Sequence, residues 1–445
     1  MNAFFATTFT DEDTNSIPEL QPRQIREALP SISISEDEVY KKLNCLSKYK
    51  SAGPDGIHPC VLKETAASVS EPLSIIYNAT LKEGKIPGAW KDNHVVPIHK
   101  KGSKMDVRNY RPISLTSVPC KILESILRDK IVDHLMENDL LCDEQHGFVP
   151  GRSCVTQLLT VMEAWSEMLD GGSPIDVVYL DFKKAFDSVP HQRLLAKLEA
   201  YGLTGPIKTW ITDFLKERRQ RVRINSDLSD WTRVRSGVPQ GSVLGPTLFV
   251  LYINDLPDRL QATTKMYADD TKLYGRASTK DDQCSLQNDL EVLMDWSTTW
   301  QLHFNTQKCT VLHIGPGNAK HIYTLGDDIL QNKSEEKDLG MQVDDELKFH
   351  NQVAYAVKKA NRVLSCIRRS FECRDRCTIP KLYKGLVRPI IDYGDSIWYP
   401  RFKMDSKAIE KVQKRATKMI YDIRNLPYIE RLRALNLPSL ENRRR

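Results

Sequence analysis

The sequence predicts an α+β fold, and the order of its elements along the chain leads to that prediction. IDVVYLD (175–181) is a β-branched run that ends in a carboxylate, a pattern typical of a buried strand. KMYADDTKLYG (265–275) has the pattern of a strand–turn–strand unit. Two helical segments and a basic hairpin separate them, so the order is that of a split βαβ unit with strands added. Beyond about residue 350 the apolar spacing becomes mainly helical.

The other elements follow from apolar periodicity and from the positions of Gly and Pro. Residues 1–45 mix polar stretches with three prolines and end in an amphipathic segment, so we expect a linker and a first helix there. The further predicted elements are a helix over 61–84, two extended pieces around a turn over 94–115, a helix over 118–139, a helix over 191–202, a basic hairpin over 219–237 and a buried helix over 244–256.

The composition is that of an ordinary soluble globular protein. The 445 residues are 40% hydrophobic and 27% charged, which is enough for two or three domains with a substantial core. The start, MNAFFATTFT, lacks the basic residues of a signal peptide, and the longest apolar run (243–253) is too short to span a bilayer. Ten scattered cysteines suggest a reducing compartment. We therefore expect a nuclear or cytoplasmic protein that is not secreted.

Charge is distributed unevenly along the chain. Residues 351–445 contain 23 Lys and Arg against 9 Asp and Glu, a net charge of +14, whereas residues 1–350 carry a net charge of −8. A basic last part beside an acidic body suggests that one part binds a polyanion while the other holds cations. The alternative is a helical surface whose lysines and arginines are merely solvated.

Two adjacent carboxylates, Asp269 and Asp270, lie between apolar and aromatic neighbours, although like charges resist burial together. An exposed hairpin tip is one explanation, and bound cations are the other. Asp181 ends the strand over 175–181, and adjacent central strands of a split βαβ sheet would bring it beside this hairpin. Three converging carboxylates favour two divalent cations, Mg²⁺ or else Mn²⁺, because these take oxygen ligands and leave room for substrate phosphates.

Seven sequence motifs follow one another in a fixed order. LDFKKAFDSVPH (180–191), SGVPQGSVLGPTLF (236–249) and YADD (267–270) are preceded by SAGPDGI, VVPIHKKG, NYRPISLTS and QHGFVPGRSC. In order and spacing they resemble the motifs of reverse transcriptases from non-LTR retrotransposons, most similar to the Jockey and chicken-repeat groups. The resemblance covers roughly residues 40–445.

The resemblance implies the roles of several residues in catalysis. Asp181, Asp269 and Asp270 match the catalytic, metal-binding carboxylates of the family. Phe186 matches an aromatic residue beside the sugar, where a ring leaves no space for a 2′-hydroxyl. Plain core packing is the alternative for this side chain.

Other motif positions match the family's nucleotide-binding residues. Gln240 and Gly241 match the loop beneath the incoming nucleotide and the template base, where Gly permits a close approach of the backbone. Lys100 or Lys101, together with Arg111, matches the cations on the triphosphate. Which of the two lysines makes the contact stays open.

The resemblance also implies a right-hand polymerase whose palm is built on the split βαβ sheet. Fingers and palm would occupy 46–345, a basic and mainly helical thumb, cut short, would occupy 346–445, and 1–45 would be the linker with its helix. Lys308 matches a lysine that can give a proton to pyrophosphate, with an exposed, merely solvated lysine as the alternative. Residues 338–349 resemble the primer-grip region.

The predicted function is RNA-directed DNA polymerisation in retrotransposition by target-primed reverse transcription. The implied partners are an RNA template, a DNA primer or target and dNTPs, with no membrane and no deducible protein partner. Because no endonuclease domain or Cys/His knuckle is recognised, we expect a piece of a longer element protein that extends a supplied 3′ end without nicking DNA. The alternatives are an inactive or repurposed nucleic-acid-binding remnant and an RNA-dependent RNA polymerase, which Phe186 and the finger motifs disfavour.

Overall fold

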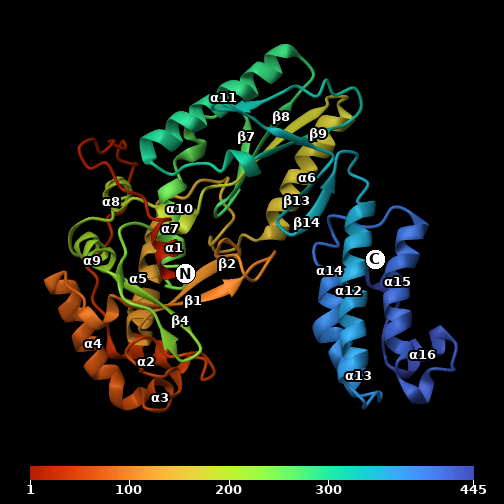
Figure 1. Ribbon diagram of the computed structural model, residues 1–445, viewed down its shortest axis with the longest axis horizontal. Helices are drawn as coiled ribbons and strands as arrows, with labels where there is room; N and C mark the ends of the chain where they lie inside the picture. The colour runs from red at the N-terminus through yellow and green to blue at the C-terminus, as the bar shows by residue number, and fades with distance from the viewer. Residues whose placement is uncertain (445) are drawn as a thin grey trace. The chain divides into compact units, whose positions relative to one another are not determined.

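The computed structural model describes residues 1–444 of the chain and contains both helices and sheets (Figure 1). The chain forms two compact units that interleave along the sequence. Unit 1 comprises 1–150, 180–271 and 288–308, and unit 2 comprises 151–179, 272–287 and 309–445. The predicted mixture of α and β structure is therefore confirmed.

Unit 1 contains the first sheet and most of the shorter helices. Its elements are α1 (Asn2–Ala6), α2 (Glu36–Asn44), α3 (Pro59–Glu64), α4 (Ala66–Glu83), η1 (Gly88–Trp90), β1 (Asp92–His99), η2 (Val107–Asn109), β2 (Tyr110–Leu115), α5 (Val118–Glu137), α7 (Ala185–Ser188), α8 (His191–Ala200), α9 (Gly205–Leu215), β4 (Arg219–Ile224), β5 (Asp227–Leu228), β6 (Thr232–Arg233), α10 (Gly245–Ile253), η3 (Leu256–Arg259), β7 (Thr263–Tyr267) and η4 (Thr306–Lys308).

Unit 2 contains the long helices of the last hundred residues, and three elements begin in one unit and end in the other. Those three are β3 (Ile175–Leu180), β8 (Asp270–Arg276) and α11 (Lys280–Trp300). The elements wholly in unit 2 are α6 (Cys154–Asp170), β9 (Thr310–Ile314), β10 (Thr324–Leu325), β11 (Asp328–Ile329), β12 (Gln331–Lys333), β13 (Glu335–Asp338), β14 (Met341–Asp344), α12 (His350–Ser370), α13 (Thr378–Leu382), η5 (Tyr383–Val387), α14 (Arg388–Asp392), α15 (Lys403–Lys418), η6 (Tyr421–Ile423), α16 (Tyr428–Ala434) and α17 (Leu440–Arg444).

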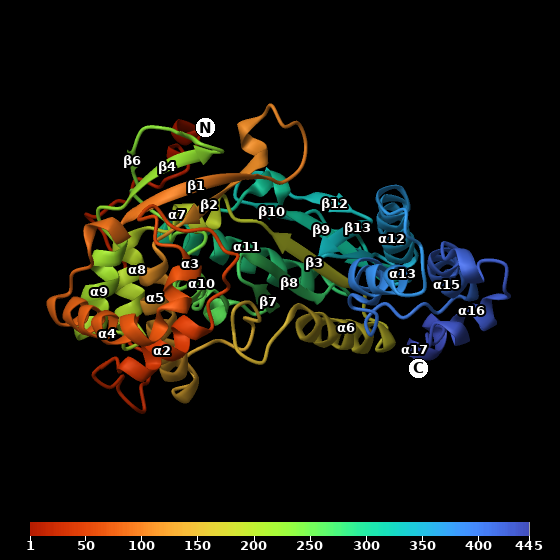
Figure 2. The same cartoon turned by 90° about the horizontal axis from the view of Figure 1, so that it is seen from below.

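The first sheet has the strand order β2-β1-β4-β5, with β6 also paired to β4. Figure 2 shows β1, β2, β4 and β6 of this sheet. The two extended pieces predicted over 94–115 are β1 and β2, which pair antiparallel from His94↔Leu115 to His99↔Tyr110. The predicted basic hairpin is β4 with its short partners β5 and β6. Strand β4 also runs parallel to β1, which the sequence alone does not indicate.

The second sheet has the order β12-β9-β3-β8-β7. The strand predicted over 175–181 is β3, and the strand–turn–strand unit predicted over 265–275 is β7 and β8. Strand β3 neighbours β8, as the split βαβ prediction requires. Asp181 follows directly on β3, so it comes to lie next to the β7–β8 hairpin.

The first 20 residues, expected to be a linker, make specific contacts within unit 1. Phe5 packs with Val95 of β1 and Val222 of β4. The guanidinium of Arg193 donates hydrogen bonds to the backbone oxygens of Asp13 (2.6 Å) and Ser16 (3.0 Å). Apolar burial and buried polar contacts together hold this segment in place.

Unit 2 has a hydrophobic core that combines early and late parts of the chain. Trp165 of α6 and Val177 of β3 belong to the same buried cluster as Leu364 of α12 and Ile409 of α15. Helices α12 and α15 lie side by side (Figure 1). The helices from α12 to α17 therefore contribute to the same core as α6 and β3.

Membrane insertion can be tested on the helices of the structure. Within residues 1–444, none has both the length and the apolar character needed to cross a bilayer.

Candidate active site

Asp181 and Lys308 form an ion pair within unit 1. The Nζ of Lys308 lies 2.9 Å from Oδ2 of Asp181, and the two side chains are 60% and 40% exposed. The backbone supports this contact, because Asn305 donates its N–H to the backbone oxygen of Asp181 at 2.6 Å. The sequence motifs single out both residues, and the structure brings them together.

Asp269 occupies a tight turn between β7 and β8 that a buried glutamine supports. Ala268 adopts a left-handed conformation with φ 54°, which is uncommon for a residue other than glycine and occurs mostly in turns. The fully buried Oε1 of Gln145 accepts hydrogen bonds from the backbone N–H groups of Ala268 (2.9 Å) and Gly147 (2.7 Å). A Cβ on Gly147 would lie 2.3 Å from the Ala268 nitrogen, so only glycine fits. Gln145 begins the QHGFVPGRSC motif, but the motif match alone implies no role for it.

Electrostatics link Asp269 to three other predicted residues. Burial raises the pKa of the Asp269 carboxyl, and the negative charge of Asp181 raises it further. The positive charges of Arg111 and Lys100 oppose that rise in the pKa. Two carboxylates and two cations thus share one small region of unit 1, as the motif matches imply.

The environments of the two candidate lysines differ. Burial lowers the pKa of Lys100, and the charges of Arg111 and Lys308 lower it further, while Asp181 acts in the opposite direction. Both lysines are exposed at the end of β1. The charge of Lys100 acts on Asp269 and is itself influenced by Asp181, and which of the two lysines contacts a triphosphate stays a prediction.

Asp270 is the first residue of β8 and is exposed. Among residues 1–444, no three His, Cys, Asp or Glu side chains come together closely enough to form a metal-binding group. The electrostatic interaction of Asp269 with Asp181 brings two of the three predicted carboxylates together. The role of Asp270 stays a prediction.

Phe186 lies on the short helix α7 and stacks on Phe249 of α10, with ring centroids 4.5 Å apart and planes 21° apart. Phe249 is fully buried, whereas Phe186 is half-buried. One face of the Phe186 ring therefore packs on the core. The two interpretations of this residue, packing and contact with a sugar, are compatible.

The loop that carries Gln240 and Gly241 is held tightly against β2. The backbone N–H of Ser114 donates a hydrogen bond to the backbone oxygen of Gln240 at 2.7 Å. Gly241 has φ 126°, and a Cβ there would lie 2.4 Å from the Ser114 oxygen. This close approach requires glycine. The residues that follow the loop are also fixed. The carboxylate of Glu124 on α5 accepts hydrogen bonds from the backbone N–H groups of Val243 (2.7 Å) and Leu244 (3.0 Å).

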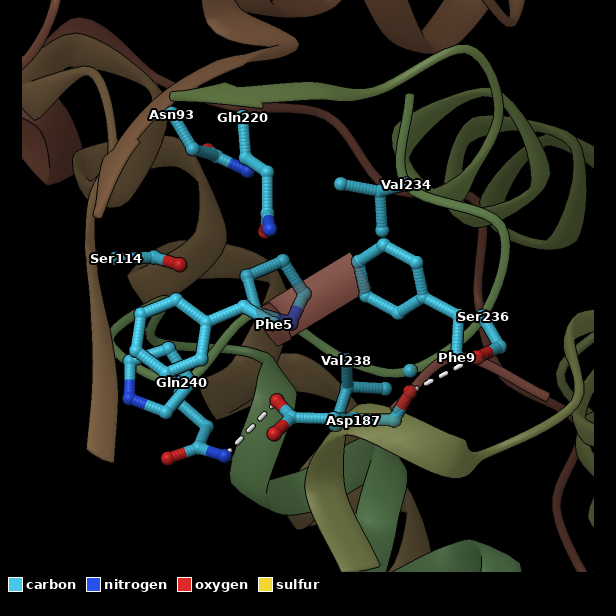
Figure 3. A pocket seen from close by; sticks show the side chains of 13 residues that line it. Phe5, Phe9, Asn93, Ser114, Asp187, Gln220, Val234, Ser236, Val238 and Gln240 are labelled. Carbon is cyan, nitrogen blue, oxygen red and sulfur yellow. Dashed lines mark hydrogen bonds between the residues drawn. The ribbon is translucent and has the colours of Figure 1, made fainter. Parts of the chain in front are cut away.

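A half-buried carboxylate next to Phe186 contacts the predicted nucleotide-binding loop. Figure 3 shows Asp187 facing Gln240, whose Nε2 donates to Oδ1 of Asp187 at 2.9 Å. Burial raises the pKa of Asp187 to about 6. Both side chains line a cavity of about 30 Å³, room for one water molecule, which Phe5 also lines. Asp187 was not among the predicted site residues, and its position directly after Phe186 in the LDFKKAFDSVPH motif is the one sequence feature that indicates it.

The paired carboxylates fit a divalent cation. A carboxyl whose pKa is raised by burial and by a second carboxylate gains stability when a cation approaches, and oxygen donors are what Mg²⁺ prefers. In this structure the ammonium of Lys308 supplies one compensating charge to Asp181. Asp181 and Asp269 could therefore share a bound Mg²⁺.

Comparison with known proteins assigns the chain to a family. The family model described as reverse transcriptase (RNA-dependent DNA polymerase) matches residues 98–349, more than half of the chain. This range includes every candidate site residue from Lys100 to Lys308. The chain belongs to the reverse transcriptase family. The resemblance inferred from the sequence motifs is confirmed.

Curated reverse transcriptase relatives come from mobile elements. A probable RNA-directed DNA polymerase from transposon BS of Drosophila melanogaster is 30% identical over 459 residues, 98% of this chain and 50% of the relative. The RNA-directed DNA polymerase from the mobile element jockey of the same species is 27% identical over 432 residues, 91% of this chain and 47% of the relative. The chain spans about half the length of these relatives.

Proposed function

We propose that this chain is an RNA-directed DNA polymerase that extends a DNA 3′ end on an RNA template by two-metal nucleotidyl transfer. The process it would serve is retrotransposition by target-primed reverse transcription. One observation carries the proposal: Asp181 and Asp269 act on each other electrostatically, while Lys308, Lys100 and Arg111 surround them. Family membership and relatives named as RNA-directed DNA polymerases support it.

The carboxylates of Asp181 and Asp269, with Asp270, would hold the divalent cations. When bound, the ions would supply activation of the 3′-hydroxyl and stabilisation of the pyrophosphate. Lys308 sits 2.9 Å from Asp181 with its side chain 60% exposed, within reach of a leaving group at these carboxylates. Its role would be to give a proton to the pyrophosphate.

The remaining residues would bind and orient the nucleotide. Arg111 offers a planar fork and Lys100 a point charge to the triphosphate. The ring of Phe186, fixed by stacking on Phe249, would fill the space next to the sugar's 2′ position and favour deoxynucleotides. The Gln240–Gly241 loop, fixed against Ser114, would lie beneath the base pair being formed.

The architecture proposed for this function is that of a right hand. The second sheet and its carboxylates would be the palm, the first sheet the fingers, and α12 to α17 the thumb. Helix α12 exposes three cations within one and a half turns, Lys358, Lys359 and Arg362, and none of them is ion-paired in the described part of the chain. These would contact phosphates of the template–primer duplex without reading its sequence.

A primer-extension assay tests the proposal. The purified chain is incubated with a DNA primer annealed to an RNA template, Mg²⁺ and either dNTPs or rNTPs. We expect extension with dNTPs and much less with rNTPs. Hybrid binding without extension would instead favour the inactive nucleic-acid-binding remnant, and a preference for rNTPs would favour an RNA polymerase.

A further inference from the structure

Residues 1–16 form a segment of unit 1 that is anchored at both ends, and we call it the N-terminal strap. Asn2 anchors its start and is only 8% exposed. The side-chain amide of Asn2 donates hydrogen bonds of 2.9 Å to the backbone oxygen of Asp230 and to Oγ1 of Thr232. Thr232 begins β6, so the start of the strap is fixed to the first sheet.

Glu12 fixes the other end of the strap to helix α8. Its carboxylate accepts hydrogen bonds of 2.9 Å from the backbone N–H groups of Gln192 and Arg193, in the first turn of that helix. N–H groups in the first turn have no acceptor within their helix, and the helix dipole favours a negative charge beside them. The residues between Asn2 and Glu12 therefore follow a defined path.

Thr10 connects the strap to two segments that are distant from it in sequence. Its hydroxyl donates a hydrogen bond to the backbone oxygen of Ser188 at 2.7 Å. Its backbone N–H donates to Oγ of Ser236, also at 2.7 Å, and that hydroxyl donates in turn to the backbone oxygen of Asp187 at 2.8 Å (Figure 3). Ser188 and Ser236 are 8% and 1% exposed, so water is largely excluded from these contacts. Thr10 thus completes a hydrogen-bonded network that includes both segments.

The two segments carry residues proposed to select the nucleotide. Phe186 directly precedes Asp187 in the first segment, and Gln240 belongs to the second. The segments also contact each other directly, through the hydrogen bond between Gln240 and Asp187. Because Thr10 binds both segments, the ring proposed to face the sugar and the loop proposed to lie beneath the base share one support.

The strap also supplies an apolar wall beside this network. Phe5 and Phe9 line the cavity of about 30 Å³ that Asp187 and Gln240 line as well, and Figure 3 shows both rings at this cavity. Phe5 is 2% exposed and packs on the first sheet. The cavity has room for one water molecule, so the packing is close and a displacement of the strap would be transmitted to Asp187 and Gln240.

We propose that the N-terminal strap is the rear support of the nucleotide site, and that Thr10 is a positioning residue for the selection of deoxynucleoside triphosphates. The inference rests on the proposed function, because Phe186 and Gln240 select a nucleotide only if the chain is a polymerase. Thr10 acts through Ser188 and Ser236, without contact to substrate. When its hydroxyl is removed, the backbone oxygen of Ser188 loses a hydrogen bond in a buried place, and the segment that carries Phe186 can shift.

Nucleotide binding without chemistry tests the inference. A DNA primer that ends in a dideoxynucleotide is annealed to an RNA template, so the next nucleotide can bind in the presence of Mg²⁺ but cannot be incorporated. The Kd values of the complementary dNTP and of the matching rNTP are measured for wild type and for Thr10→Val. Because a buried acceptor loses its donor, the variant should bind dNTP about tenfold more weakly, and its preference for dNTP over rNTP should fall about threefold.

A conservative variant and a matched control separate positioning from folding. Thr10→Ser keeps the hydroxyl and should restore the wild-type Kd for dNTP. Thr212→Val removes another half-buried hydroxyl, which donates to a backbone oxygen at 2.7 Å within α9, and it should bind dNTP as wild type does. The affinity for the hybrid should be the same in all of these proteins, whereas a general loss of structure would lower it.

A second change in the strap makes the test independent of how well Thr10→Val folds. Phe9→Leu reduces the apolar wall without removing a hydrogen bond, and it should raise the Kd for dNTP about threefold. This variant replaces Thr10→Val in the comparison if the valine protein does not fold.

The possible outcomes distinguish this inference from the proposed function. Wild-type affinities for dNTP and rNTP in Thr10→Val would overturn the inference, and so would an equal loss in Thr10→Ser or Thr212→Val. Wild-type protein that binds dNTP in the dideoxy complex but does not extend a primer with a normal 3′ end would refute the proposed polymerase and leave the role of the strap standing. Wild-type protein that binds neither nucleotide would overturn both.

Discussion

The carboxylate of Asp187 accepts a hydrogen bond from the side-chain amide of Gln240 at 2.9 Å. A second link joins the same segments, because Val238 donates its N–H to the Phe186 oxygen at 2.7 Å. The residue proposed to sense the sugar and the residue proposed to lie under the base are thus fixed to one another. Asp187 would act as a positioning residue, without contact to substrate.

Removing the acceptor on Asp187 should weaken nucleotide binding. In Asp187→Leu, the Gln240 amide loses its partner, and we expect KM for dNTPs to rise about tenfold, equivalent to about 1.4 kcal/mol, with kcat little changed. In Asp187→Asn, Oδ1 can still accept the bond, so KM should stay near wild type. Steady-state single-nucleotide incorporation measures both. A wild-type KM in Asp187→Leu would show that Asp187 does not position Gln240 for nucleotide binding.

The pKa of Asp187 also makes stability depend on pH. Its folded pKa of about 6 lies above the unfolded value of about 3.9. Between these values the folded state binds more protons, so the free energy of unfolding should fall as pH rises from about 4 to about 6. Asp187→Asn abolishes this titration and should be more stable than wild type at pH 7.5, by up to about 3 kcal/mol. Urea unfolding of wild type and Asp187→Asn at pH 4 and pH 7.5 measures the difference in their free energies of unfolding. The same difference at both pH values would contradict a raised pKa of Asp187.

Phe186→Ala should raise incorporation of ribonucleotides relative to deoxynucleotides. Loss of the ring opens space beside the sugar, and we expect the ratio of kcat/KM for dNTP over rNTP to fall by about 10- to 100-fold. Phe186→Tyr keeps the ring and its stacking on Phe249, so it serves as the control. An unchanged ratio in the alanine variant would restrict Phe186 to core packing.

Lys308 can be tested as a proton donor with two substitutions. Lys308→Gln removes the charge beside Asp181, whereas Lys308→Arg keeps a charge that does not give up its proton. If Lys308 protonates pyrophosphate, single-turnover extension should slow about 100-fold in both variants, and hybrid affinity should not change. Recovery of the wild-type rate by arginine would show that Lys308 serves only as a counter-ion to Asp181.

The sequence was sufficient for the features that local pattern and motif order determine. Strand β3, the β7–β8 hairpin and the neighbourhood of Asp181 and Asp269 are all found where predicted, because buried strands, tight turns and carboxylates at strand ends have distinctive local signatures. Lys308 was singled out through its motif, and it lies beside Asp181.

Contacts between distant segments were not predictable from local pattern. Phe5 meets Val222, and Gln145 supports Ala268 across 123 residues of sequence. Asp187 is half-buried at a cavity that Phe5 and Phe9 of the N-terminal segment also line, and no periodicity specifies how that segment packs.

The extension rate of carboxylate variants tests the central claim most directly. Asp181→Asn and Asp269→Asn are compared with Asp327→Asn, an exposed control in unit 2, on a DNA primer annealed to an RNA template with Mg²⁺. Because metal-bound carboxylates contribute several kcal/mol to transition-state stabilisation, both active-site variants should lose about three orders of magnitude in rate. Hybrid affinity and the control should match wild type. Rates within about tenfold of wild type for either variant would contradict the two-metal polymerase.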